Sequence, residues 1–143
     1  MTTNPVPEPH YISRQVQAAR RFYFGLDVVP AGELAVVCGG WERTAADYTI
    51  HRDTFPWIGL EFVAGGRGRL HLRGMTQTLE RGAVFSYGPG VPHRIESDPD
   101  AVLSKYYLNF SGREAADLMS SVLLSPGSYR LMRNAGELEE AFV

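Results

Sequence analysis

The sequence has little cysteine, no long apolar run and no excess of charge of either sign. Cys38 is the only cysteine among 143 residues, which excludes an internal disulfide and fits a reducing cytoplasm. No segment approaches the run of about 18 apolar residues that a membrane helix needs. The proline-rich start (residues 1–9) lacks the apolar core of a signal peptide. We therefore expect a cytoplasmic domain with no membrane partner.

Charge excludes a further class of function for this segment. The 14 Lys and Arg residues are balanced by 16 Asp and Glu residues, so the net charge is −2. A surface that binds the phosphates of nucleic acid is strongly basic. Hydrophobic residues make up 44% of the chain and charged residues 21%, which is ordinary for a single globular domain of this length. We expect one hydrophobic core and no direct contact between this segment and DNA.

Short runs of β-favouring residues follow one another between residues 34 and 110. Turn residues such as Gly39-Gly40, Gly65-Gly66 and Gly88-Pro89-Gly90 separate the runs at intervals of about eight to twelve residues. This spacing predicts a mainly β fold, an antiparallel barrel or sandwich of the two-sheet jelly-roll kind. The predicted strands cover residues 34–38, 48–52, 57–63, 69–73, 76–79, 84–87, 93–97 and 103–110.

Both ends of the chain predict helices. Residues 1–12 form an extended arm, and Ser13 caps a short helix over residues 14–22. After the last strand, residues 112–124 place apolar side chains on one helical stripe, and Asn134 caps a second helix. The second helix has no stop signal, so we expect a longer natural protein. The predicted parts are 1–33 (arm and helix), 34–112 (barrel) and 113–143 (C-terminal helical segment).

Residues 82–93 carry the most specific motif. They read as a strand, a turn built on glycine and proline, and His93 at the start of the next strand. This run resembles the second cupin motif, with Gly88 in place of its first proline. Residues 57–74 resemble the first cupin hairpin, but the metal-binding His-x-His is absent and Gly59 stands at the glutamate position. A metal site needs at least three placed ligands. We therefore expect no metal and no other cofactor, and a hydrogen-bonded His93 at the barrel mouth.

With these motifs in place, a wider resemblance covers roughly residues 34–125. The runs 38–52 and 106–112 are similar to the opening and closing strands of the effector-binding domain of AraC-type transcription regulators. The resemblance implies a sugar or another small polar effector inside the barrel. It also implies a homodimer in the full-length protein and DNA binding only through a C-terminal domain absent from this chain. Effector binding would then act by a population shift that engages or releases the DNA-binding half.

The resemblance also implies which residues bind the effector. An arginine at the position of Arg52 contacts the sugar in the arabinose-responsive member, and a guanidinium forks onto hydroxyls or a carboxylate. His93 stands at the mouth. Burial alone would turn Lys105 and Tyr107 outward to solvent, whereas the family pattern turns them into the cavity, and we favour the cavity because a hydrophilic ligand requires polar walls.

Three further residues complete the predicted site. Glu61 has the inward parity of its strand and would need Arg52 or Lys105 as a partner, although an exposed Glu61 is an open alternative. Ile95 and Cys38 are weaker candidates. Ile95 stands where the sugar-binding relative has tyrosine, and Lys105 where it has histidine. We therefore expect a ligand other than arabinose, and the residues suit a neutral sugar and a sugar acid equally.

Two other functions stay open. One is a stand-alone metal-dependent cupin enzyme, an isomerase or dioxygenase, and the other is a non-catalytic sugar-binding module without a DNA-binding partner. We favour a sensor that is not an enzyme. The sequence shows no nucleophile paired with a base, and no motif pairs Cys38 with a histidine that could activate its thiol. The sequence does not fix the effector, the target genes, or activation against repression.

Overall fold

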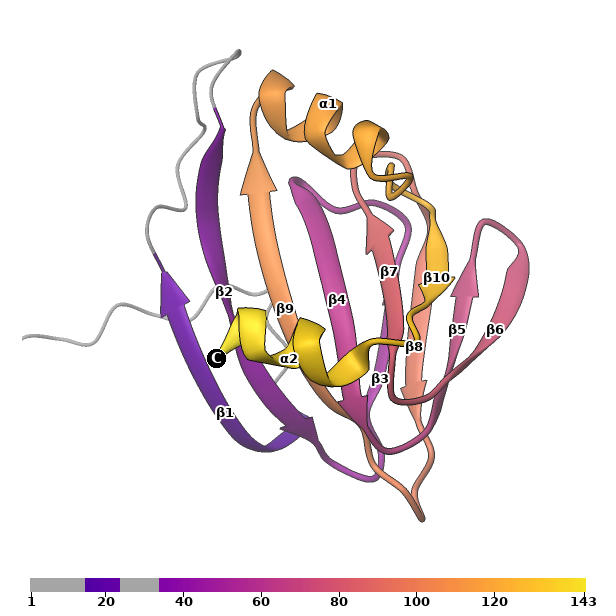
Figure 1. The fold of residues 1–143 in the computed structure, drawn as a ribbon. Coiled ribbons are helices and arrows are strands. Elements are labelled where there is room, and N and C mark those ends of the chain that lie inside the picture. The colour runs from indigo at the N-terminus through magenta and orange to yellow at the C-terminus, as the bar shows by residue number, and fades with distance from the viewer. Residues whose placement is uncertain (1–14, 24–33) are drawn as a thin grey trace, which may run out of the picture.

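Two antiparallel sheets face each other and enclose most of the buried side chains. The structure is a computed structural model that describes residues 15–23 and 34–143. The larger sheet has the strand order β1 (Val16–Tyr23), β2 (Ala35–Thr44), β9 (Ser104–Ser111), β4 (Ile58–Gly65), β7 (Ala83–Tyr87) and β10 (Tyr129–Leu131) (Figure 1). The smaller sheet has the order β3 (Thr49–Arg52), β8 (His93–Ser97), β5 (Gly68–Leu72) and β6 (Met75–Leu79).

All eight strands predicted between residues 34 and 110 are present, but β2 is longer than its pattern suggested. Gly39-Gly40 is not a break, because β2 runs through it to Thr44 between β1 and β9. A Cβ atom on Gly39 would lie 2.7 Å from the Phe22 ring, and one on Gly40 would lie 2.0 Å from the carbonyl oxygen of Arg20. The two glycines therefore permit close packing against β1 rather than a turn.

The predicted N-terminal helix is wrong. Residues Val16–Tyr23 form β1, which pairs antiparallel with β2 from Val16 opposite Thr44 to Tyr23 opposite Cys38. Apolar residues in a short segment fit helical and strand spacing equally, and the backbone groups along β2 supply the hydrogen bonds that decide for a strand. The predicted cap Ser13 and the arm over residues 1–12 lie outside the described residues.

The C-terminal helices lie where the periodicity places them. Helix α1 (Arg113–Ser121) follows β9, and α2 (Ala135–Phe142) follows β10. Asn134 occupies the N-cap position of α2, but its side chain makes no capping hydrogen bond. Among the described residues, no helix is long and apolar enough to cross a membrane.

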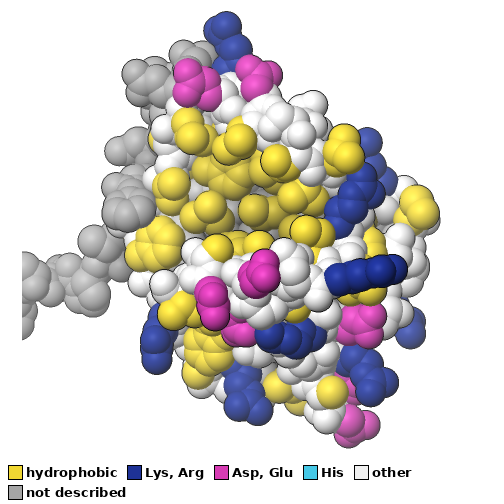
Figure 2. Space-filling view, viewed as in Figure 1, with side chains coloured by type: hydrophobic (Ala, Val, Ile, Leu, Met, Phe, Trp, Pro, Cys, Tyr) yellow, Lys and Arg dark blue, Asp and Glu magenta, His cyan; other side chains and the backbone are white. Residues whose placement is uncertain are grey.

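Both faces of the six-stranded sheet are covered in part. Its inner face packs on the four-stranded sheet, and its outer face carries α1 and α2, which cross the strands at different levels (Figure 1). Ala115 and Met119 of α1 pack on Ile58 and Phe110, while Phe142 of α2 stacks on Phe62. An apolar surface remains visible between the two helices (Figure 2). Because helices α1 and α2 cover part of the outer face, apolar residues of the six-stranded sheet are buried on the outer face as well as on the inner face.

Candidate functional site

Strand β9 presents its polar residues to the interior. Lys105, Tyr107 and Asn109 alternate along it and are 2%, 7% and 2% exposed. The neighbouring strands place Glu42 opposite Lys105 and Glu61 opposite Tyr107, so these side chains share the inner face. The family pattern predicted that this polar face turns to the interior, whereas burial alone predicted that it turns to solvent. In the structure it faces the interior. The outer residues of β9 are covered by α1 and α2 instead of by the second sheet.

A buried ammonium group between two carboxylates forms the centre of the site. Lys105 Nζ donates to Glu61 Oε1 at 2.5 Å and lies 2.7 Å from Glu42 Oε1. All three side chains are at most 5% exposed. Lys105 thus supplies the partner that an inward Glu61 required. The second carboxylate, from Glu42, was missed by the sequence analysis, because the strand was ended before it.

Tyrosines and an arginine surround this ion cluster. Tyr87 donates its hydroxyl hydrogen to Glu61 Oε2 at 2.5 Å, and Tyr48 donates to Glu42 Oε1 at 3.5 Å. Arg21 of β1 lies 3.4 Å from Glu42 Oε2. Lys105 Nζ is also 5.4 Å from the centre of the Tyr48 ring and 5.7 Å from that of Tyr107, within reach of cation–π attraction.

The charges of Lys105 and Glu42 hold each other in the ionised state. Burial alone would lower the pKa of Lys105, but the carboxylates of Glu42 and Glu61 outweigh it and raise that pKa well above its ordinary value. Burial alone would raise the pKa of Glu42, but Lys105, with help from Arg21, brings it below the ordinary value. Burial is also the main reason why the pKa of Tyr87 is raised, so its phenol keeps the hydrogen that it donates.

His93 and Arg52 lie together at the neighbouring part of the four-stranded sheet. The two residues are paired across β3 and β8, and Arg52 Nη1 is 3.4 Å from His93 Nε2. His93 Nδ1 is 3.0 Å from the Val91 carbonyl oxygen, so Nδ1 carries the hydrogen and Nε2 accepts from Arg52. Burial, and then the Arg52 charge, lower the pKa of His93, although the Val91 hydrogen bond opposes them.

Aromatic rings connect His93 to the ion cluster. The His93 ring stacks on Tyr87 with centroids 4.0 Å apart and an interplanar angle of 17°. The same Tyr87 donates to Glu61, and its ring lies against Gly59, where a Cβ atom would be 2.3 Å away from it. Phe55 lies 5.0 Å below the Arg52 guanidinium. The glycine at position 59 therefore makes room for the ring that joins both halves of the site.

The remaining predicted residues lie beside this centre. Cys38 is buried next to Tyr107 and accepts a hydrogen bond from Asn109 Nδ2 at 3.1 Å, and burial raises the pKa of its thiol. Ile95 is fully buried in the apolar cluster and has no polar role. Tyr87 and Tyr48 were not predicted, and Asn109, which shares the strand face of Lys105 and Tyr107, was not predicted as a site residue. Tyr87 shares the parity of Phe85 on β7, so extending strand alternation to every inner strand would have found it.

The residues do not fit a cupin metal site. Within residues 15–23 and 34–143, no three His, Cys, Asp or Glu side chains are grouped so that they could hold a metal ion. Both nitrogens of His93 are engaged, and the one that faces away from the backbone lies beside the cationic Arg52. A nearby guanidinium repels a metal cation.

Comparison with known proteins gives the family and the fold. Residues 35–142 match the family described as the AraC-like ligand binding domain. YhaK from Escherichia coli is structurally similar, with a TM-score of 0.58 and 16% identity over 83% of this chain and 53% of YhaK. A structure titled as salicylate 1,2-dioxygenase from Pseudoaminobacter salicylatoxidans, with gentisate adducts, has a TM-score of 0.50 and 18% identity over 89% of this chain and 31% of its own. No curated protein sequence matches.

These similarities carry different weights. At such low identities the two structures show the fold alone, a mainly β, cupin-like sandwich of two antiparallel sheets, as the sequence predicts. The chain spans about half the length of YhaK and about a third of the dioxygenase, so activities of those whole proteins do not carry over. The family match covers most of the chain.

Proposed function

Because the chain belongs to the AraC-like ligand binding domain family, we propose that it senses a small polar effector, a sugar or a sugar acid, held between the two sheets. The observation that best supports this proposal is the row of buried polar side chains on the inner face of β9 and its neighbours. A purely structural sandwich fills that space with apolar residues, whereas a site for a hydrophilic ligand needs a few convergent polar groups.

The proposed contacts divide between the two sheets. Arg52 offers a forked cation for a hydroxyl pair or a carboxylate, with His93 beside it. On the opposite sheet the carboxylates of Glu61 and Glu42 accept hydrogen bonds from hydroxyls, and the Tyr107 ring provides a stacking face. Lys105 contributes through these carboxylates, because both already neutralise it. Ile95 and Cys38 would form apolar walls.

We further propose that the domain regulates transcription and is not an enzyme. In this proposal it acts in the cytoplasm, in a full-length homodimer that contacts DNA through a C-terminal domain outside this sequence. Helix α2 offers a route for the signal. Phe142 stacks near Phe62 and Tyr106, which directly follow Glu61 and Lys105 in their strands. A ligand that shifts the inner residues would change the support of α2, and with it the population of DNA-binding states.

Thermal unfolding with and without ligand tests the binding proposal. The probes are neutral aldoses and the matching uronic acids at millimolar concentration. A ligand at 100 times its Kd stabilises the native state by about 2.7 kcal/mol, which is a measurable rise in Tm. We expect Arg52→Ala to fold and to lose this rise. Arg94→Ala is the matched control, because Arg94 directly follows His93, the strand partner of Arg52, and its side chain is 48% exposed and paired with Glu96.

A ligand response in Arg52→Ala equal to that of the wild type would contradict the assigned site. The regulatory part needs a separate test, the mass and sequence of the natural gene product. A product about twice as long, with helix-turn-helix segments after Val143, supports the transcription role. A product that ends near Val143 removes that role and leaves the sugar-binding module. Metal analysis of purified protein addresses the enzyme alternative, since stoichiometric iron, manganese or zinc would favour it.

A further inference from the structure

We infer that the Tyr107 hydroxyl and the Asn109 side-chain amide form a subsite that binds an uncharged, hydroxyl-bearing part of the ligand. The inference rests on the proposed function and specifies the chemistry of one side of the same interior. It concerns the part of the six-stranded sheet that lies beyond the Lys105 ion cluster along β9. Asn109 was not among the site residues predicted from the sequence.

The inference starts from two buried polar atoms that lack partners. Among the described residues, nothing donates to or accepts from the Tyr107 hydroxyl, and nothing donates to Asn109 Oδ1. Tyr107 is 7% exposed and Asn109 2% exposed, so bulk water does not substitute for the missing bonds. Leaving buried polar atoms unpaired costs stability, and a native protein that retains two of them side by side calls for an explanation. A ligand that supplies both bonds is such an explanation.

The local packing holds both groups in place. Asn109 Nδ2 donates to Cys38 Sγ, which fixes the amide and leaves its oxygen directed away from that bond. Tyr107 packs with Val37, Cys38 and Trp57 in a small apolar cluster. Residues two apart on one face of a strand are separated by about 7 Å. One small polyhydroxy molecule can therefore reach both groups while an apolar edge of it rests on the cluster.

Charge selects the class of ligand group. The carboxylate of Glu42 lies near Tyr107, and Lys105 is neutralised by Glu42 and Glu61. Burial, followed by the Glu42 charge, raises the pKa of Tyr107, so its phenol keeps its hydrogen. Arg21 also lies near Tyr107, but it and Lys105 are both paired with Glu42, so a ligand carboxylate placed here would meet the Glu42 charge with both cations already engaged. Hydroxyl groups donate to the Asn109 oxygen without that penalty, so this side of the site fits neutral hydroxyls.

Two variants test the subsite without any ligand. Tyr107→Phe removes one oxygen, and Asn109→Leu replaces the amide oxygen and nitrogen by methyl groups at the same branch point. If both groups await a ligand, the ligand-free protein should keep its Tm or gain a few degrees, because an unpaired buried polar atom is removed. The matched control is Tyr106→Phe, which changes the next residue on the outer face, where the hydroxyl lies 3.5 Å from Glu139. A lower Tm for both inner variants would overturn the inference, since it would show that both groups are already satisfied.

Calorimetric titration supplies the second test. The probes are neutral aldoses, their uronic acids and their single-deoxy analogues. We expect Tyr107→Phe and Asn109→Leu each to raise the Kd of the binding aldose about tenfold, the worth of one lost hydrogen bond, and Tyr106→Phe to leave it unchanged. One deoxy analogue should bind wild type weakly and Tyr107→Phe no more weakly, which is the signature of direct coupling between that hydroxyl and Tyr107.

The outcomes separate this inference from the proposed function. If Arg52→Ala loses binding while both inner variants bind like wild type, the effector site stands and the subsite is wrong. If the inner variants weaken the uronic acids and leave the neutral aldoses unchanged, the ligand class assigned here is wrong. If no probe binds wild type, the proposed function and this inference both fail for polyhydroxy ligands.

Discussion

The two faces of β9, in the six-stranded sheet, are built on opposite principles. On the outer face, apolar residues of β4 and β9 pack under α1 and α2. On the inner face of the same strands, Lys105 and Glu61 are buried as an ion pair and Asn109 donates to Cys38 Sγ. Alternation along β9 therefore separates an apolar face from a polar face, and both faces are covered by other elements. Polarity here marks the side on which a ligand is expected, and does not mark the side that faces solvent.

The energetics of the two faces differ as well. Apolar burial stabilises the fold roughly in proportion to the area removed from water. A buried ion cluster gains little net stability, since removing its charges from water costs about as much as their attraction returns. The apolar contacts under the helices thus contribute to stability, whereas the ion cluster on the inner face is retained at little or no gain. Substitutions on each face should show this asymmetry.

The largest effect is expected when the ion cluster loses its cation. Lys105→Met leaves Glu42 and Glu61 buried and facing each other, which should lower the free energy of unfolding by about 3–5 kcal/mol. Urea unfolding at neutral pH, followed by tryptophan fluorescence, measures the loss. The control is the triple variant Lys105→Met, Glu42→Gln, Glu61→Gln, which removes all three charges and should recover most of the stability. A single variant as stable as wild type would mean that the carboxylates take up protons at little cost.

The outer face should respond through lost packing. Met119 of α1 is 3% exposed and packs on Ile58 and Phe110. Met119→Ala should lower the free energy of unfolding by about 2–3 kcal/mol, because buried methylene groups are lost and the space refills only in part. Leu118→Ala on the same helix, where the side chain is 51% exposed, is the matched control and should change stability by less than about 0.5 kcal/mol. Equal losses in both variants would show that α1 is not seated as described.

The strand pattern was readable from the sequence because turn residues bound each run and the runs alternate. The same pattern failed where tertiary contacts decide. Val16–Tyr23 is a strand since β2 offers it an edge, and Gly39-Gly40 lies inside β2 because β1 approaches it closely. Ending β2 at residue 38 also hid Glu42, the second carboxylate of the site. Local composition gave no means of detecting either neighbour.

The site residues divide in a similar way. The inward positions of Glu61, Lys105 and Tyr107 followed from parity and family resemblance, and the pairing of Arg52 with His93 joins two predicted residues. Tyr87 links these halves by stacking on His93 and donating to Glu61, and no motif pointed to it. The position of Tyr87 between His93 and Glu61 depends on distances in three dimensions, which strand patterns do not give. That the predicted site residues contact a ligand remains a prediction.

A smaller effect should come from the pH dependence of His93. Its pKa is lowered in the folded state by burial and by Arg52, so the unfolded chain binds a proton more readily. Stability should therefore be full above the unfolded pKa of about 6.5 and fall as pH drops below it. His93→Gln should have a shallower decline between pH 7 and 5 than wild type. An unchanged slope in His93→Gln would mean that His93 protonates without penalty.

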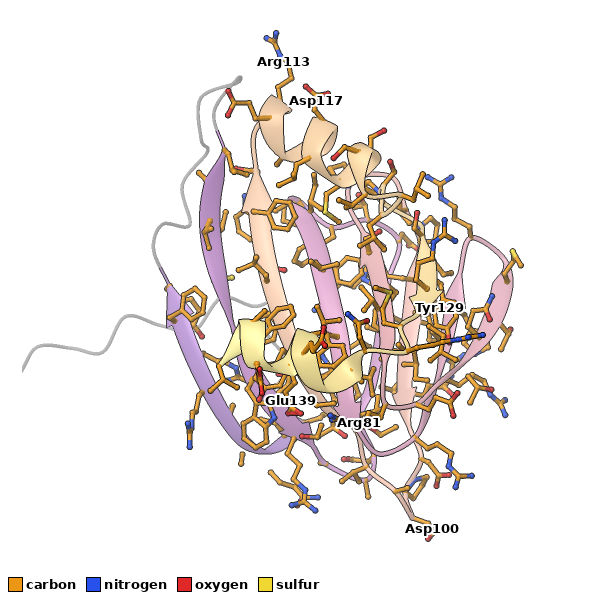
Figure 3. All side chains as sticks on the ribbon, in the orientation of Figure 1. Arg81, Asp100, Arg113, Asp117, Tyr129 and Glu139 are labelled. Carbon is orange, nitrogen blue, oxygen red and sulfur yellow. The ribbon has the colours of Figure 1, made fainter. Side chains whose placement is uncertain are left out.

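The smallest effect is expected at the outer rim, where Arg81 and Glu139 lie side by side (Figure 3). Arg81 Nη1 is 2.9 Å from Glu139 Oε1, and the two side chains are 46% and 30% exposed. An exposed pair of this kind is worth less than about 1 kcal/mol and weakens in salt. Glu139→Gln should therefore lower the unfolding free energy by less than that amount, and by less still in 0.5 M salt (about a 4 Å screening length).

Phe142→Ala should lower the unfolding free energy by more than Glu139→Gln, because stacking on Phe62 and Tyr106 holds α2 by apolar contact. If Glu139→Gln proved the more damaging change, α2 would be held by charge, and the rule that the outer face is stabilised by apolar burial would not extend to this helix.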